Sequence, residues 1–386
     1  MRIVFKAPVA IAALSLLALP VASCSAQSAS RDGGQASPAD GSFQIADVGR
    51  FAEPWALAFE PGTGTLFVTE KAGQIRFVRT DGRLGTVTGV PKVDYGGQGG
   101  LGDIAFAPDY ATSRAVYLSW VECGTRGTRG AAVGKATLDC AGGDTCGLKD
   151  LTVIWRQIPK VDGRGHFSHR LTFSPDGQFL FVASGDRQKM TPAQDLSVNL
   201  GKIVRLTLDG RPASGNPFAS RGGIAAQIWS LGHRNILGLE FDAEGRLWDL
   251  EHGPEGGDEL NRVEPGSNCG WPLVSQGDHY GGTPIPRHST RPGFAAPAIS
   301  WSPVIAPGGF IFYSGAMFPA WQGQALIAGM KYEGLVRVAI DGGRAREVER
   351  IPLGSRIRAI AEAPDGSIWI VEDEANGRLR KFTARR

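Results

Sequence analysis

Short runs of apolar residues alternate with polar turns along most of this chain, from Phe43 onward. One theme recurs: an apolar strand, a turn rich in Pro, Asp and Gly, and a second apolar strand such as Phe179–Val182. Apolar runs of about four to eight residues bounded by such turns are typical of β-strands. Five clear copies and a sixth, degenerate one contain LAFEPG (57–62), IAFAPD (104–109), LTFSPDG (171–177), LEFDAEG (239–245), IAEAPDG (360–366) and FPAWQGQALI (318–327).

This repetition predicts an all-β fold, a six-bladed β-propeller of four-stranded antiparallel blades. A β-sandwich would also contain short strands, but it would not repeat one turn signature along the whole chain. A propeller needs its ring closed, and we expect Phe43–Arg50 to pair with Gly377–Thr383 in the last blade. The 54 glycines and 24 prolines fit many turns and very little helix. We therefore expect one domain, residues 43–386, with its functional loops at the central channel.

Residues 1–24 have the pattern of an export signal, with a basic start and an apolar run, Val9–Leu19, that is too short to span a bilayer comfortably. Val21–Cys24 resembles a bacterial lipobox, in which the cysteine is lipidated and becomes the mature N-terminus. Plain secretion, with cleavage near Ala26, is the alternative. Residues 25–42 are rich in Ser, Gly, Ala and Asp, which predicts a flexible tether. We expect an exported, periplasmic protein that a lipid on Cys24 anchors to the cell envelope.

The other four cysteines are Cys123, Cys140, Cys146 and Cys269. An oxidising compartment permits disulfides, and four cysteines allow three pairings, which the sequence leaves open. Cys140 and Cys146 bracket a short glycine-rich loop that a disulfide could close. No Cys-x-x-Cys pattern is present, so we expect no zinc site.

The formal net charge of +3 is too small to indicate a nucleic acid or an anionic membrane surface as partner, so the chemistry must come from local clusters. His166 lies in a glycine-rich loop, where an imidazole that titrates near neutral pH can take a proton from an alcohol. His169 stands at a strand entry and is expected to be packed. Asp186 ends the same hairpin and could orient His166. Gln98, in another glycine-rich stretch, offers a donor and an acceptor to a ligand.

Opposite charges gather at the two ends of one hairpin, within residues 231–272. Arg234 and Asn235 precede its strands, and the acidic loop Glu251–Glu259 follows them. Carboxylates and bare backbone carbonyls on a flexible loop suit calcium better than zinc or copper. The cluster predicts an anionic ligand and a hard cation that lie side by side.

Three further cations, Lys331, Arg356 and Arg358, come from other blades. Arg356 and Arg358 are two positions apart, so both point to the same face of a strand. Cations at an innermost strand should be lodged only where an anion neutralises them. With Arg234, the set suits a ligand that carries several carboxylates.

These residues, in this order, resemble the soluble pyrroloquinoline quinone (PQQ)-dependent sugar dehydrogenases, and the bacterial aldose sugar dehydrogenases more closely than the soluble glucose dehydrogenase. The similarity runs from about Pro54 to Phe382. It is most specific at LGHRN (231–235), EHGP (251–254), GDELN (257–261), NCGWP (268–272) and GKIVRL (201–206). The family is a six-bladed propeller. It oxidises sugars at C1 to lactones by hydride transfer to PQQ, and it passes the electrons to an external acceptor.

The resemblance implies a role for each candidate residue. His166 would take the proton of the anomeric hydroxyl, with Asp186 in support. Gln98 would contact the substrate or the quinone. Arg234 would stabilise charge on a quinone oxygen and, with Asn235, hold the cofactor. Lys331, Arg356 and Arg358 would meet the PQQ carboxylates, the carbonyls of Gly253 and Pro254 would bind the calcium that polarises the quinone, and Glu259 with the carbonyl of Cys269 would bind a second, structural calcium.

The chain also departs from the family. Position 269 is Cys where the glucose enzyme has Tyr, which a carbonyl ligand would survive. The long loops that shape the sugar pocket and dimer contact of that enzyme have no counterpart, and Ser300–Pro303 predicts a more open pocket. We therefore expect broad aldose specificity and a monomer.

Two rival functions remain open. A calcium-dependent propeller lactonase would need carboxylate side chains that converge on the metal, and it would have no use for four cations. A non-catalytic binding propeller should have lost the base or the cations, which are all present.

Overall fold

The computed structural model describes residues 43–140 and 143–385. The predicted signal and tether segments, with Cys24, lie outside these residues, and so does Arg386. Strands make up nearly all the regular secondary structure of the described part, which has a single short α-helix, α1 (Tyr110–Ser113), and several one-turn 3-10 segments. No helix within it is long and apolar enough to cross a membrane. The expected all-β fold with very little helix is confirmed.

Most strands form antiparallel sheets of four. One sheet contains β10 (Ser168–Phe173), β11 (Phe179–Ser184), β12 (Lys202–Thr207) and β13 (Ile228–Leu231). The next contains β14 (Ile236–Phe241), β15 (Leu247–Glu251), β16 (Asp258–Arg262) and β17 (Ile299–Trp301). A third contains β18 (Pro307–Phe312), β19 (Ala325–Gly329), β20 (Gly334–Asp341) and β21 (Arg344–Pro352).

The first strands of the chain belong to an eight-stranded sheet. One half is β2 (Pro54–Phe59), β3 (Leu66–Glu70), β4 (Gln74–Val78) and β5 (Leu84–Thr88), and the other is β9 (Thr145–Arg156), β8 (Arg129–Asp139), β7 (Ala115–Cys123) and β6 (Leu101–Phe106). Parallel pairing of β5 with β9 joins the two halves, each of which is antiparallel. A disulfide between Cys140 and Cys146 lies at this junction, whereas Cys123 and Cys269 are free.

The two ends of the described chain meet in one sheet. β1 (Phe43–Phe51) pairs antiparallel with β24 (Gly377–Ala384), and Phe43 lies opposite Ala384. The sheet continues with β23 (Ile368–Glu372) and β22 (Ile357–Glu362). The predicted pairing of the terminal strands is confirmed, and each strand is one residue longer than the sequence suggested.

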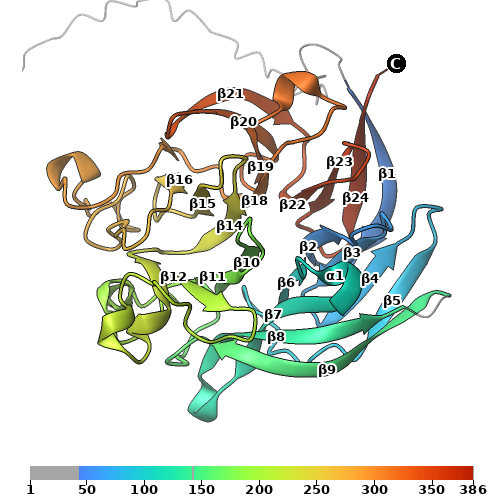
Figure 1. The fold of residues 1–386 in the computed structure, drawn as a ribbon. Helices are drawn as coiled ribbons and strands as arrows, with labels where there is room; N and C mark the ends of the chain where they lie inside the picture. The colour runs from blue at the N-terminus through green and yellow to red at the C-terminus, as the bar shows by residue number, and fades with distance from the viewer. Residues whose placement is uncertain (1–42, 141–142, 386) are drawn as a thin grey trace, which may run out of the picture. The chain divides into compact units, whose positions relative to one another are not determined.

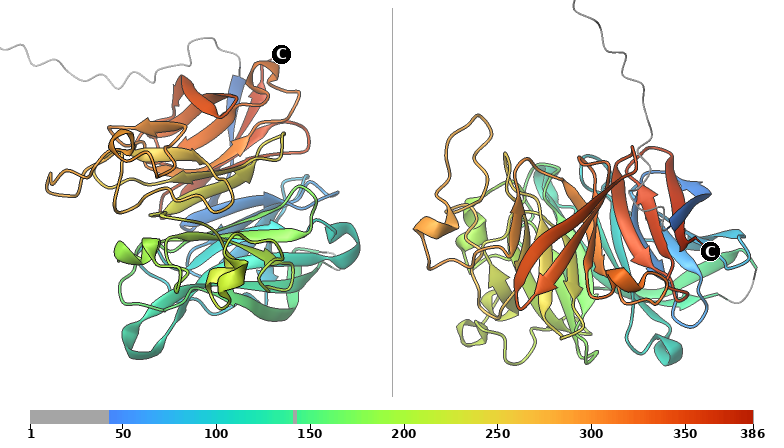
Figure 2. Two further views of the ribbon diagram at one scale, coloured as in Figure 1. Left: turned by 60° about the vertical axis from the view of Figure 1, so that its left-hand side comes forward. Right: turned by 90° about the horizontal axis from the view of Figure 1, so that it is seen from above.

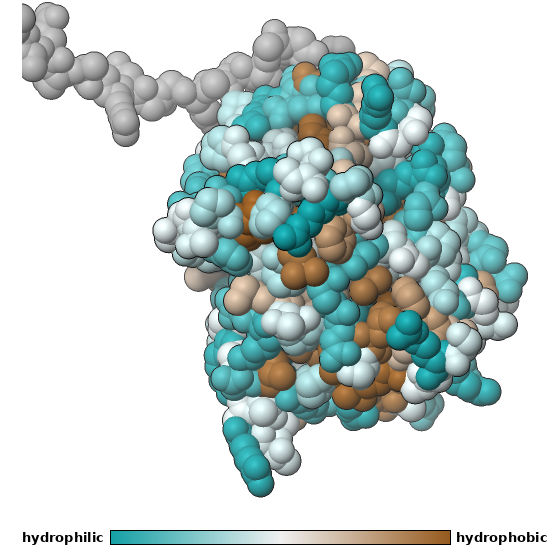
Figure 3. Space-filling model, turned by 90° about the vertical axis from the view of Figure 1, so that its left-hand side faces the viewer, coloured by the Kyte–Doolittle hydropathy of each residue, from teal (hydrophilic) through white to brown (hydrophobic). Residues whose placement is uncertain are grey.

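The sheets are arranged radially around a common centre (Figure 1). The strands nearest the centre are β2, β6, β10, β14, β18 and β22, each in contact with the next, and β22 contacts β2. Seen from above, the sheets stand beside one another as separate layers (Figure 2). Apolar side chains fill the spaces between neighbouring sheets; one such cluster joins Tyr117 and Trp155 to Leu180 and Val204. Hydrophilic residues cover most of the face shown in Figure 3, with smaller hydrophobic patches between them.

The repeated turn has one place in the fold. Every copy, including the degenerate one, connects an innermost strand to the second strand of its sheet. In the copy between β10 and β11, a carboxylate oxygen of Asp176 accepts bonds from the Ser174 hydroxyl and the Gln178 N–H, and Gly177 has a φ of +72°. A side-chain-bonded Asp followed by a left-handed Gly closes such a turn tightly. In each sheet, the second strand therefore runs back from the turn to the end at which the innermost strand begins.

Candidate active site

The candidate residues lie where innermost strands begin and second strands end. Paired antiparallel strands bring these two positions to one end of each hairpin. His166, Arg234 and Arg356 shortly precede β10, β14 and β22, and Asp186 and Lys331 shortly follow β11 and β19. The same end of the radial array thus receives polar side chains from almost every sheet.

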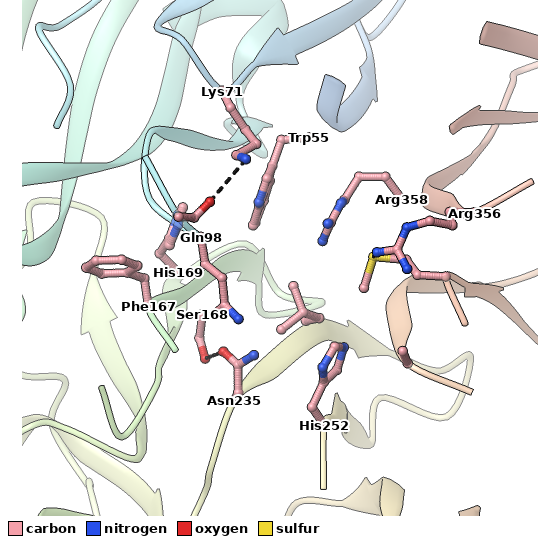
Figure 4. Close-up of a pocket in the computed structure, with 14 residues that line it drawn as sticks. Trp55, Lys71, Gln98, Phe167, Ser168, His169, Asn235, His252, Arg356 and Arg358 are labelled. Atoms are coloured by element: carbon pink, nitrogen blue, oxygen red, sulfur yellow. Dashed lines mark hydrogen bonds between the residues drawn. The ribbon is translucent and has the colours of Figure 1, made fainter. Parts of the chain in front are cut away.

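A cavity of about 250 Å³ opens among these strand ends (Figure 4). Arg356 and Arg358 enter it from one side, and Gln98, Ser168 and Asn235 lie across from them. The full lining is Trp55, Lys71, Gly97, Gln98, Phe167, Ser168, His169, Asn235, Leu237, His252, Ala306, Met330, Arg356 and Arg358. Cationic and amide groups face each other over a few apolar side chains, which suits a flat anionic ligand.

Arg356 and Arg358 share a carboxylate that the sequence analysis missed. Asp373, directly after β23, accepts bonds from Arg356 at 3.0 and 2.6 Å and from Arg358 at 2.7 and 2.5 Å. Burial opposes ionisation of Asp373, but the two guanidinium groups outweigh it and hold its pKa below the usual value. The protein therefore supplies one of the neutralising anions itself, and two cations on one carboxylate leave a net positive charge.

The lysine that lines the cavity is not the one that the sequence predicted. Lys331 is exposed and is not among the residues that line the cavity, although its neighbour Met330 is. Lys71, which the sequence analysis did not select, does line it, and its ammonium group donates to the Gly97 carbonyl at 3.2 Å and to Glu53 at 3.1 Å. The cationic lining therefore comes from Lys71, Arg356 and Arg358.

The expectation that His169 is packed is confirmed. Its ring stacks on Trp55 at 4.8 Å, and its Nδ1 lies 2.8 Å from the hydroxyl of Ser119. Burial lowers the pKa of His169 to about 3. The Arg170 guanidinium carbon lies 4.0 Å from the same Trp55 ring. Trp55 is thus a rigid apolar wall of the cavity, and His169 stays neutral.

His166 forms a short bond with Asp186, with 2.7 Å between Nδ1 and Oδ1. Its backbone N–H donates to Oε1 of Gln98, also at 2.7 Å. His166 does not line the cavity itself, but Gln98 and the three residues after His166 do. Burial lowers the pKa of His166; the bond to Asp186 opposes this, and the charge of Arg234 adds to it. The imidazole is therefore neutral at pH 7, with Nδ1–H toward Asp186 and a lone pair on Nε2.

Asp186 is fully buried and strongly held. Its Oδ2 accepts from the indole N–H of Trp271 at 2.8 Å, and backbone N–H groups of Gln188 and Met190 also donate to the carboxylate. Burial alone would raise its pKa, but the bonds from His166 and Trp271 keep the pKa below the usual value. A fixed carboxylate at Nδ1 is the arrangement that orients a histidine base.

Arg234 completes this group. Its guanidinium carbon lies 5.3 Å from the Trp271 ring centre and 5.9 Å from that of Tyr280, and one terminal nitrogen donates to the carbonyl of His252 at 3.1 Å. Its Nε is buried and has no hydrogen-bond partner within the described ranges. Asn235 lines the main cavity, where Oδ1 accepts from Ser168 at 3.4 Å.

All four candidate metal ligands line one small cavity with Arg234. Gly253, Pro254, Glu259 and Cys269 surround a space of about 20 Å³, which is room for one water molecule or ion. In the described part of the chain, neither the Gly253 nor the Pro254 carbonyl accepts a hydrogen bond. The Cys269 carbonyl accepts one from His288 at 2.9 Å.

The acidic side chains of this loop have separate tasks. Asp258 accepts the N–H groups of Gly253 at 3.0 Å and Ala306 at 2.7 Å, so it shapes the loop. Burial raises its pKa to about 6. Glu259 is buried, and burial together with Glu251 raises its pKa well above the usual value. A buried carboxyl of this kind ionises readily only beside a cation.

The Glucose / Sorbosone dehydrogenase family model matches residues 51–381, nearly all of the described chain. The chain belongs to this family. Aldose sugar dehydrogenase YliI of Escherichia coli is 38% identical over 338 residues, which cover 86% of this chain and 90% of that protein.

Solved structures of this dehydrogenase family agree with the fold. The apo form of the soluble aldose sugar dehydrogenase from Escherichia coli matches with a TM-score of 0.83 and 36% identity, over 89% of this chain and 100% of that one. The PQQ-bound aldose sugar dehydrogenase from Streptomyces coelicolor matches with a TM-score of 0.75 and 30% identity, over 91% and 100%. The sheets described above are accordingly those of a β-propeller.

Sequence reasoning missed several residues of the candidate site, namely Trp55, Lys71, His252, Trp271 and Asp373. One signal could have found three of them. Lys71, His252 and Asp373 each directly follow a second strand, as Lys331 nearly does. Trp271 lies inside the NCGWP motif. Its indole N–H donates to Asp186, 85 residues away in the chain, and the motif alone does not indicate this contact.

Proposed function

We propose that this chain oxidises aldose sugars at C1 to lactones, with PQQ and Ca²⁺ as cofactors. The named relative from Escherichia coli and the PQQ-bound relative from Streptomyces coelicolor support this reaction class. The observation that carries the proposal is the His166–Asp186 pair, a neutral and oriented base beside a cavity lined by cations and amides.

The residues fit both cofactors. The cavity offers Lys71, Arg356 and Arg358 to the carboxylates of PQQ, and Gln98 and Asn235 to its other polar atoms. Nε of Arg234 has no partner among the described residues, and an anionic ligand would supply one. The carbonyls of Gly253 and Pro254 accept no hydrogen bond there, and a hard cation would bind them. Bound PQQ would supply the two-electron acceptor and bound Ca²⁺ the Lewis acid.

The chain supplies the proton chemistry and the orientation. His166 accepts the anomeric hydroxyl proton on Nε2, because the bond from Nδ1–H to Asp186 fixes the tautomer. Asp186 then stabilises the imidazolium, and Trp271 with two backbone N–H groups holds Asp186 in place. Arg234, stacked near Trp271 and Tyr280, places a fixed positive charge next to the base.

The lactonase alternative has less support. A calcium-dependent lactonase needs carboxylate side chains around its metal, and none of the described residues that line the main cavity is Asp or Glu. The non-catalytic alternative is disfavoured because the oriented base and the cationic lining are both present.

The finer expectations on architecture and location form part of this proposal. We count the eight-stranded sheet as two blades, since β5 and β9 are outer strands of two four-stranded antiparallel halves; this gives six blades. The chain acts as a monomer on a range of aldoses in the periplasm, held by a lipid on Cys24, and passes electrons to an external quinone or cytochrome.

Reconstitution tests the function. Purified apoprotein is mixed with PQQ and Ca²⁺, and reduction of a redox dye is followed with several aldoses. We expect turnover that requires the sugar and both cofactors, together with retained PQQ absorbance after gel filtration. Absence of both turnover with every aldose and retained PQQ would overturn the proposal; release of acid from a lactone would favour the hydrolase.

A further inference from the structure

A second cluster of reactive side chains lies near the Arg234 backbone, and the proposed PQQ and calcium sites use none of these side chains. His233 comes from the β13–β14 connection, Asp249 from β15, and Cys269 from the loop between β16 and β17. One ligand atom from each, including Sγ of Cys269, lies within 4.8 Å of the others. All three residues are buried, and Cys269 takes no part in a disulfide.

The histidine in this cluster faces two carboxylates. Nε2 of His233 lies 2.8 Å from the hydroxyl of Ser230, while Nδ1 lies 3.1 Å from Oδ2 of Asp249 and 3.2 Å from Oε1 of Glu251. A lone pair on Nδ1 would be repelled by both oxygens. While both carboxylates are ionised, Nδ1 must therefore bear a proton or bind a metal ion, with Nε2–H donated to Ser230 in the second case.

Two buried oxygen atoms in the cluster are poorly satisfied. Oδ1 of Asn261 accepts no hydrogen bond from any described residue, and Oδ2 of Asp249 has only the ion pair with Nδ1 of His233 at 3.1 Å, although both side chains are almost completely buried. Nδ2 of Asn261 donates to Asp249 at 3.0 Å and to Glu251 at 3.3 Å, so one amide group holds both carboxylates in position. Buried polar atoms without partners are costly, and their presence indicates a ligand.

The charges are also unbalanced. Asp249, Glu251 and Glu259 are buried together, and within the described ranges no lysine or arginine side chain forms an ion pair with any of them. His233 is their one basic partner there, and it can carry a single positive charge. Burial raises the pKa of Glu251 and Glu259, and a divalent cation beside these carboxyl groups would favour their ionised form.

We propose that His233, Asp249 and Cys269 bind a zinc-type divalent metal ion through imidazole, carboxylate and thiolate, with the Glu251 carboxylate beside the site, 3.2 Å from Nδ1 of His233. This ligand set is typical of a borderline-soft ion. Zinc bonds of about 2.0–2.3 Å place tetrahedral ligand atoms about 3.3–3.8 Å apart. The 4.8 Å spread of the ligand atoms would therefore shorten on binding, while the 3.1 Å separation between Nδ1 of His233 and Oδ2 of Asp249 would lengthen slightly. The thiol proton of Cys269 leaves to solvent as the metal binds.

This site differs from the second calcium site in ligand and in chemistry. The calcium prediction used the carbonyl of Cys269, which accepts a bond from His288, whereas the present site uses the sulfur. No motif indicates this site, because its three ligands come from three separate segments with no recognisable metal spacing.

The metal would have a structural task. Oε2 of Glu251 accepts the backbone N–H of Arg234 at 2.6 Å, so the carboxylate beside the metal also fixes the Arg234 backbone. The ion would clamp the β13–β14 connection to β15. Only this link to Arg234 rests on the proposed function, and metal binding itself can be tested without any enzyme assay.

Cobalt substitution provides the test. Full-chain protein is stripped with a chelator and titrated with Co²⁺, and the thiolate-to-cobalt charge-transfer band in the near ultraviolet is recorded. We expect the band to saturate at one Co²⁺ per chain and to be abolished by Zn²⁺ but not by excess Ca²⁺. Cys269→Ser should remove the band, and Cys123→Ser, which alters the exposed free cysteine, should leave it unchanged. Ser230→Ala should weaken Co²⁺ binding about tenfold.

Each other outcome overturns the proposal. A missing band in the unaltered protein, or a band lost with Cys123→Ser alone, would show that the cluster is a proton-sharing network. Displacement of Co²⁺ by Ca²⁺ would make it a calcium site only. If Cys269→Ser fails to fold, the Cys123→Ser protein decides the matter: Zn²⁺ should slow modification of the Cys269 thiol, and an unchanged rate at Cys269 would refute thiolate ligation.

Discussion

Two histidines of this protein, His166 and His233, each place Nδ1 against buried carboxylate groups, yet their protonation differs. His166 faces Asp186 alone and stands near Arg234 and Arg187, and its pKa is lowered. Around His233, burial favours the neutral form, but Cys269 and Asp249 outweigh it and raise its pKa well above the usual value. The fold is the same at both places, since each histidine precedes an innermost strand.

The difference shows what makes a base out of a buried histidine. One carboxylate orients the ring without charging it, as long as burial and neighbouring cations offset the attraction for a second proton. Two carboxylates and a thiol with no cation nearby convert the same ring into a cation or a metal ligand. Position in the propeller brings the histidine to the site, and the count of charged neighbours decides its chemistry.

The largest effect should come from removal of the base. His166→Gln keeps an amide that can donate to Asp186 but cannot accept a proton at neutral pH. We expect kcat of the reconstituted enzyme to fall about 10³–10⁴-fold, while retained PQQ absorbance stays near that of the unaltered protein. Comparable turnover in the variant would mean that His166 is not the base.

A smaller loss should follow when the base is kept and its partner is neutralised. Asp186→Asn leaves His166 in place but no longer fixes the tautomer with Nδ1–H toward the partner. We expect kcat to fall about 10²–10³-fold, with KM changed much less. A rise in KM alone would show that Asp186 serves substrate binding rather than the orientation of His166.

Removing the basic partner of the second cluster should act on stability instead. His233→Gln leaves Asp249 and Glu251 buried without a cation. With a chelator present, we expect the free energy of unfolding in urea to fall by about 3–5 kcal/mol. The matched His166→Gln protein, which removes a neutral ring, should lose much less, and equal losses would contradict the assignment of charge to the two rings.

The smallest effect is a shift along the pH axis. Because the pKa of His166 is lowered in the folded protein, the base stays deprotonated below the ordinary histidine value of about 6.5. We expect kcat/KM to stay level from neutral pH down past that value and to decline only at lower pH. If kcat/KM falls to half its plateau value at a pH above 6.5, the pKa of His166 is not lowered and the prediction is wrong.

The fold was largely predictable from the sequence because its signal is local and repeated. The turn copies mark the same connection in each sheet, and the alternation of short apolar runs left no room for helices. The pairing of Phe43–Arg50 with the last strand followed from the need to close a ring, and β1 confirms it.

The site was predictable only where a motif carried it. His166 precedes the first strand of one hairpin and Asp186 follows the second, so strand pairing brings both to the open end of the hairpin. Asp373 was missed because its partners, Arg356 and Arg358, belong to the opposite strand, and the anion expected for them was a ligand. Lys331 and Lys71 differ for a similar reason: both follow second strands, and only side-chain packing decides which one enters the cavity. The His233 cluster has no sequence signature at all.

The pairing of β1 with β24 has a consequence for how the chain becomes a protein. Gln44 donates to Thr383, a contact between residues 339 positions apart. A polypeptide that emerges with its N-terminus first must hold the β1 segment without its partner until the final residues arrive. Contacts of such long range close late and slowly. A chain that stops short of β24 would therefore leave both β1 and the edge of β23 unpaired.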